Sequence, residues 1–162
     1  MKFSALLILE VAAVVFLLLS GTALPEHVAS HFVADGSANS SMPRGAYLGL
    51  MVGLTVGLPF LLALPGWLMQ RVPLSLVRLP HKEYWLAPER RASTLAFMTR
   101  RSTMFGAFVI VFLCYVHWLV VEANRAAPPY LATRPLVAGL LAFAICTMVW
   151  AGLFVAHFLR RP

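Results

Sequence analysis

The stretch SALLILEVAAVVFLLLSGTAL, residues 4–24, is apolar apart from one charged residue, Glu10. A membrane-spanning helix needs about 20 mostly apolar residues, so this stretch is long enough to cross a bilayer. It also exceeds the roughly 7–15 apolar residues that form the core of a signal peptide. We therefore interpret it as a retained membrane anchor.

Three more stretches have a similar length and composition. Residues 45–64, 104–121 and 136–158 contain no Asp, Glu, Lys or Arg. The whole chain of 162 residues is 60% hydrophobic and only 12% charged, whereas a soluble domain is roughly 25% charged. The sequence excludes a disordered chain and predicts an all-α bundle of four transmembrane helices, with residues 1–162 as a single domain.

The basic residues indicate how the spans are oriented. Cytoplasmic loops carry an excess of Lys and Arg, which predicts that both termini and segment 70–103 are cytoplasmic and that residues 25–44 form an outer loop. We interpret the charge as attraction to the anionic inner leaflet, and not as nucleic-acid binding. Ten of the 13 Lys and Arg residues lie on the predicted inner side, namely Lys2, Arg71, Arg78, Lys82, Arg90, Arg91, Arg100, Arg101, Arg160 and Arg161.

The inner segment contains the start of a helix. Pro88 suits the first turn of a helix, and Glu89 suits the positive end of its dipole. Apolar residues then alternate with four arginines up to position 101. We predict a short basic helix at the membrane interface ahead of the third span, with Tyr84 and Trp85 in the same interface.

The second span carries glycines at every fourth position, which places them on one face of a helix. Small residues on such a face let another helix approach closely. We expect a contact face there, whose partner is the first span, the fourth span or another copy of the chain. Its glycines are Gly45, Gly49, Gly53 and Gly57.

Glu10 is the most costly residue to place in lipid, because an intramembrane charge costs about 2.5–3.5 kcal/mol. We interpret it as a carboxyl that faces the bundle and forms a hydrogen bond with a neighbouring helix. A proton or ion relay is the alternative.

Three histidines are candidates for a metal or haem site. His27 and His31 are four residues apart, and His117 lies near the outer end of the third span. No CxxCH or HExxH motif accompanies them, so each is also interpreted as an ordinary hydrogen-bonding group. Catalytic motifs such as GxSxG and the P-loop are missing from the sequence. We therefore predict neither an enzyme nor a cofactor.

Two loop stretches resemble a known family. LPEHVASHF (residues 24–32), followed by Asp35-Gly36 and Met42-Pro43-Arg44, resembles the signature of the DUF1648 membrane proteins, a domain that also begins the SdpI-type bacterial immunity and signalling proteins. LPHKEYWLAPER (residues 79–90) is similar to the Pro-Asn-Lys-x-Tyr-Trp-Leu-x-Pro-Glu-Arg motif of short members. The family positions implied by the resemblance are His31, Phe32, Gly36, Pro80, Lys82, Tyr84, Trp85, Pro88 and Glu89.

The chain departs from the family pattern at His27 and at His81, which replaces the usual Asn. It also lacks the further helices of full SdpI-type proteins, so immunity to a toxin is not implied. The resemblance implies a non-enzymatic bacterial inner-membrane protein that acts in sensing or signalling through contacts with other membrane proteins or with itself. The alternatives are an accessory subunit packed through the glycine face, or a small haem- or metal-binding redox protein that uses His27, His31 and His117.

Overall fold

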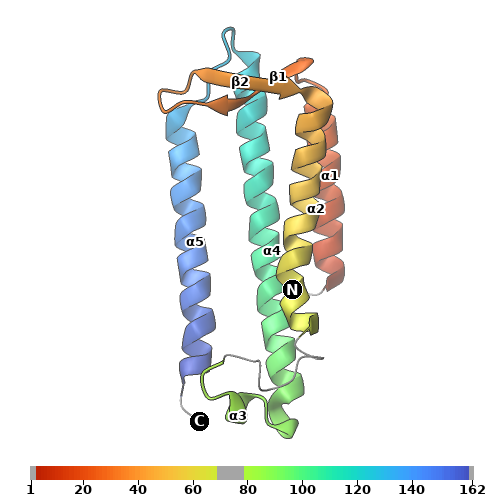
Figure 1. Ribbon diagram of the computed structural model, residues 1–162, viewed down its shortest axis with the longest axis vertical. Helices are drawn as coiled ribbons and strands as arrows, with labels where there is room; N and C mark the ends of the chain where they lie inside the picture. Colours follow the sequence, from red (N-terminus) through yellow and green to blue (C-terminus); the bar gives the residue numbers. More distant parts are fainter. Residues whose placement is uncertain (1–2, 69–78, 161–162) are drawn as a thin grey trace.

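The computed structural model describes residues 3–68 and 79–160, and it consists mainly of long helices (Figure 1). Within this part of the chain, four helices are long and apolar enough to cross a membrane. They confirm the predicted four-helix architecture and are consistent with a multi-pass membrane protein. The helices are α1 (Phe3–Gly21), α2 (Arg44–Leu68), α4 (Pro88–Arg125) and α5 (Thr133–Leu159).

Helix α4 differs most from the prediction. It has 38 residues, which at 1.5 Å per residue is about 57 Å and nearly twice the thickness of a hydrocarbon core of about 30 Å. Between Pro88 and Gly106 the sequence has no proline or glycine, so nothing interrupts the helix. The basic stretch expected as a separate short helix is therefore the first part of α4. Residues 70–78 of the expected inner segment lie outside the described residues.

Helix α4 is also the centre of the bundle, because it packs against α1 and α2 on one side and α5 on the other (Figure 1). It approaches α2 closely at Gly106, where an added Cβ would lie 3.3 Å from the Cβ of Pro59. The main core joins α1, α2, α4 and the outer segment. It consists of Leu17, Leu24, Val28, Tyr47, Met51, Val120 and Val121.

Helix α5 lies apart from α1 and α2 and packs along α4 (Figure 1). Phe158 is its one buried residue. Its contact face is largely aromatic: the rings of Phe112 and Phe143 stack with their centroids 4.2 Å apart, and those of Phe105 and Trp150 lie 4.5 Å apart. Ring contacts thus hold α5 to α4, while most of its surface stays open.

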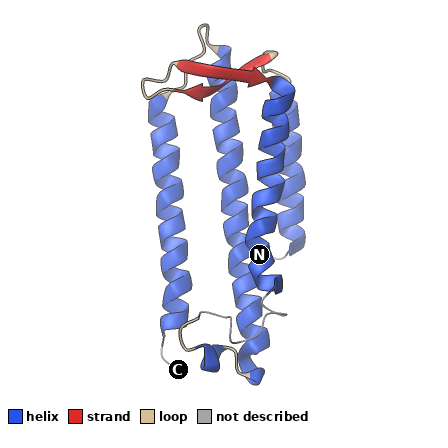
Figure 2. Cartoon of the chain, viewed as in Figure 1, coloured by secondary structure: helices blue, strands red, loops and turns tan. Residues whose placement is uncertain are grey.

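The predicted outer loop folds into a β-hairpin that lies across one end of the bundle (Figure 2). Strand β1 (His27–Phe32) pairs antiparallel with β2 (Ala38–Pro43). The sequence predicted an outer loop without strands, and the correction has a tertiary cause. Val28 and Ala29 of β1 are buried against the helix ends, whereas β2 is mostly exposed. The hairpin is a small addition to an otherwise helical fold.

Candidate functional site

His117 lies in the interior of the bundle with no exposed surface. Its Nε2 is 2.9 Å from Ser20 Oγ on α1, and its Nδ1 is 3.0 Å from the Tyr47 hydroxyl on α2. Ser20 donates its own hydrogen to the carbonyl oxygen of Phe16, so it accepts from the imidazole. Tyr47 then donates to Nδ1. A neutral His117 joins three helices in this way.

The three histidines that were candidates for the alternative metal or haem site do not lie together. His27 and His31 lie exposed on β1, because the segment is a strand and the helical spacing assumed for them does not apply. His117 is held by Ser20 and Tyr47 inside the bundle. Within the described part of the chain, no three His, Cys, Asp or Glu residues lie close enough together to hold a metal ion.

The first family-like motif places Gly36 in the turn of the hairpin, and His31 and Phe32 at the end of β1. Gly36 has a φ of 96°, a left-handed conformation that favours glycine, and its carbonyl accepts from the Leu131 amide at 2.8 Å. Phe32 packs against Leu119, Ala123 and Leu131. The motif therefore fastens the hairpin to the loop between α4 and α5.

Asp35 shapes the same turn. Its Oδ1 accepts from the backbone N–H of Ser37 at 2.8 Å and from the Ser37 hydroxyl at 2.7 Å. These hydrogen bonds lower the pKa of the Asp35 carboxyl below its ordinary value, because both donors favour the charged form.

Asn124 anchors the first strand to α4, a role that the sequence analysis missed. Its side-chain oxygen accepts from the Ala29 amide at 2.8 Å, and its side-chain nitrogen donates to the Ala29 carbonyl at 3.0 Å. This pair of bonds imitates a neighbouring strand at a point where the ladder between β1 and β2 shifts register. The sign of this role in the sequence is the polar side chain of Asn124 directly after an apolar span.

The second family-like motif packs against the end of α5. Trp85 lies in the short helix α3 (Lys82–Trp85), and its indole N–H donates to the carbonyl of Phe158 at 3.2 Å. The guanidinium of Arg90 lies 3.9 Å from the centre of the Tyr84 ring. These side chains contact their own chain, and their place in the membrane interface stays a prediction. Of the other motif residues, Pro88 and Glu89 begin α4 as expected, Lys82 begins α3, and Pro80 is exposed.

The glycine face of α2 points away from the bundle. An added Cβ at Gly45, Gly49, Gly53 or Gly57 would meet no atom within 4 Å. The buried face of α2 carries Tyr47, Met51, Thr55 and Pro59, each two positions and hence about 200° around the helix from a glycine. Neither the first nor the fourth span covers the glycine face.

Glu10 lies in an open groove of about 390 Å³ between α1 and α2. The groove is lined by apolar side chains and by Gly57, which also belongs to the glycine face. The expected hydrogen bond to a neighbouring helix is not formed with any described residue, because the facing turn of α2 offers only apolar side chains. An unpaired carboxyl therefore lies beside an uncovered glycine face.

No family model, curated protein or solved structure matches this chain. The relation to the DUF1648 and SdpI-type proteins thus stays a prediction from the two loop motifs. The structure itself places the exposed glycine face of α2 beside the groove that holds Glu10.

Proposed function

We propose that this chain is a non-enzymatic bacterial inner-membrane protein, with both termini in the cytoplasm, that acts by binding another membrane protein. Its mostly exposed apolar helices support a place in the membrane. The predominance of Lys and Arg in the segments between α2 and α4 and at the termini supports the orientation. The family resemblance supports a role in sensing or signalling.

The outward glycine face of α2 is the observation that carries the proposal. Glycine lowers the stability of a helix by about 1 kcal/mol relative to alanine. On an exposed face, no packing contact within the chain offsets this loss. Close packing of a partner helix against Gly49 and Gly53 offsets it through dispersion contacts. The face fits a transmembrane helix of another protein or of a second copy.

Glu10 gives the contact a polar centre. An intramembrane carboxylate costs about 2.5–3.5 kcal/mol without a partner, and the groove that holds it is bordered by Gly57. A helix packed on the glycine face can place a hydrogen-bond donor against this carboxyl. The partner helix is therefore expected to carry a donor such as Ser, Asn or Lys at that depth.

Replacing Gly53 with Leu tests the face, and Gly152→Leu is its matched control. Both glycines are exposed, and a Cβ at either meets nothing within 4 Å, so neither change introduces a clash at Cβ in the folded chain. Leucine is also the better helix former. We expect Gly53→Leu to abolish association, measured as protein co-purified in mild detergent or as self-association by native mass spectrometry. Gly152→Leu should leave it unchanged.

Equal association of wild type and both variants would contradict the proposed face. Glu10→Gln gives an independent comparison, because it removes the charge and keeps the size. We expect weaker association with normal insertion. The redox alternative gains no support from the geometry, since the ring nitrogens of His117 are occupied by Ser20 and Tyr47.

A further inference from the structure

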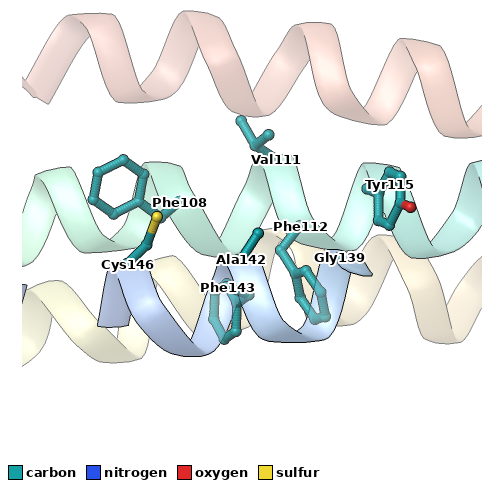
Figure 3. Close-up of a pocket in the computed structure, with 8 residues that line it drawn as sticks. All are labelled: Phe108, Val111, Phe112, Tyr115, Gly139, Ala142, Phe143 and Cys146. Atoms are coloured by element: carbon teal, nitrogen blue, oxygen red, sulfur yellow. The ribbon is translucent and has the colours of Figure 1, made fainter. Parts of the chain in front are cut away.

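The seam between α4 and α5 contains an apolar groove of about 600 Å³ (Figure 3). Phe108 and Phe112 of α4 and Ala142 and Cys146 of α5 are among its lining residues. The lining residues of α4 run from Phe108 to Tyr115, a rise of about 10 Å along the helix. The groove is open along the side of the bundle, where one hydrocarbon chain can lie.

Two unsatisfied hydrogen-bond donors lie in the same seam, toward the end where α4 begins and α5 ends. The Nε of Arg101 and the Oγ1 of Thr147 are both buried and have no hydrogen-bond partner among the described residues. Arg101 precedes Phe108 by seven residues and thus shares its face of α4. The indole N–H of Trp150 donates to the Arg101 carbonyl at 3.1 Å, which places Arg101 at the level of Trp150 and one turn from Thr147.

This end of the seam is positively charged. Arg101 and Arg160 both lie within electrostatic reach of the His157 ring. The ion pair found in the described residues joins Glu122 and Arg125 at the other end of α4, so Arg101 has no acidic partner there. An unsatisfied buried donor is costly, and an anionic oxygen is the ligand that best satisfies an arginine.

We propose that this seam binds one anionic phospholipid from the leaflet at the C-terminal end of the bundle. The phosphate lies on the guanidinium of Arg101, an ester oxygen accepts from the Thr147 hydroxyl, and one acyl chain occupies the groove. The order of the three features along the seam, from charge to hydroxyl to apolar groove, matches the order of the three parts of a phospholipid. This site is distinct from the glycine face of α2 and does not depend on it.

Native mass spectrometry of the full chain in neutral detergent tests the site. The probes are phosphatidylglycerol and phosphatidylcholine with identical acyl chains. We expect one phosphatidylglycerol to bind at least about tenfold more tightly than phosphatidylcholine, because the choline group brings a positive charge to an end of the seam that already carries Arg101 and Arg160. Arg101→Gln should remove this preference, whereas Arg100→Gln, which removes the same charge from the exposed adjacent position, should keep it.

The groove has its own matched pair of variants. Ala142→Phe fills the groove, while Ala144→Phe adds the same ring to an exposed position of α5 outside the lining. We expect Ala142→Phe alone to weaken phosphatidylglycerol binding. The proposal is overturned if both lipids bind equally, if Arg100→Gln and Arg101→Gln act alike, or if Ala142→Phe changes only the dimer fraction.

Discussion

A buried histidine needs two hydrogen-bond partners, one for each ring nitrogen, and His117 finds them on two different helices. Ser20 accepts from Nε2 and the Tyr47 hydroxyl donates to Nδ1. The Tyr47 ring also stacks on the imidazole at 5.6 Å with an interplanar angle of 19°. Apolar side chains alone leave the rotation of the helices weakly defined, so these directional bonds fix how α1, α2 and α4 meet.

Tyr47→Phe is expected to destabilise the protein. The change removes the hydroxyl that donates to His117 and keeps the stacked ring, which leaves a buried acceptor unsatisfied at a cost of about 1–3 kcal/mol. Unfolding by denaturant titration in detergent measures the loss. Tyr130→Phe is the control, because Tyr130 is 53% exposed. Equal stability of the two variants would show that the bond contributes nothing.

The hairpin turn is expected to loosen in acid. The folded-state pKa of Asp35 is lowered by the two donors on Ser37, so the ionised carboxylate stabilises the turn above about pH 4. This stabilisation is lost as the pH falls through the lowered pKa. Protection of the Ser37 amide from hydrogen exchange should therefore drop below about pH 4 in the wild type. Asp35→Asn, which does not titrate, should show no such step.

The position and the contacts of single residues could be predicted from the sequence only in part. The depth of His117 near the outer end of its span could be read from hydropathy, and the Glu122–Arg125 pair follows from its spacing. The partners of His117 could not be predicted, because Ser20 lies 97 residues away. Such contacts depend on how three helices are rotated, which no local pattern encodes.

Among the elements, the hairpin depends most on contacts made at a distance. A hairpin of two strands is marginally stable on its own in water. Here β1 is attached to α4 through the two bonds between Asn124 and Ala29. The turn is bonded to the loop after α4 through Gly36 and Leu131. We infer that the hairpin forms when the helices assemble.

Asn124→Ala is expected to release β1 from α4. It removes two hydrogen bonds to Ala29 and leaves both its N–H and its carbonyl without the Asn124 partner, at a cost of about 1–3 kcal/mol for each group. Hydrogen exchange at the Ala29 amide should become at least about tenfold faster, because a loss of about 1.4 kcal/mol changes an opening equilibrium by that factor. Exchange in helix α1 should stay unchanged. The control is Asn39→Ala on the exposed strand β2. Similar exchange in both variants would contradict the anchoring role.

The long helices could be predicted because about 20 successive apolar residues allow few other structures. The continuity of α4 could not, since a basic amphipathic stretch suits an interfacial helix as well as an extension of the span. The strands were missed because β2, with the sequence ANSSMP, carries a turn-like composition. Its pairing with β1 follows from the burial of Val28 and Ala29, which is a tertiary effect.

At the scale of the whole molecule, the bundle is asymmetric. Helices α1, α2 and α4 share a core, while α5 contacts α4 along an aromatic stripe and buries only Phe158. The fold thus leaves two different surfaces open, the glycine face of α2 and the seam beside α5. The sequence predicted the first as a contact face, but only the fold determines that it points outward.

The proposed orientation places the hairpin and the basic end of α4 on opposite sides of a membrane, with the basic end in the cytoplasm. Ser40→Cys and Ser93→Cys place thiols at exposed positions of β2 and of the first turns of α4, with Cys114 and Cys146 replaced by Ala. In intact cells, a membrane-impermeant maleimide should label the cysteine at position 40, and should label the one at position 93 only after permeabilisation. Labelling at position 93 in intact cells would contradict the account.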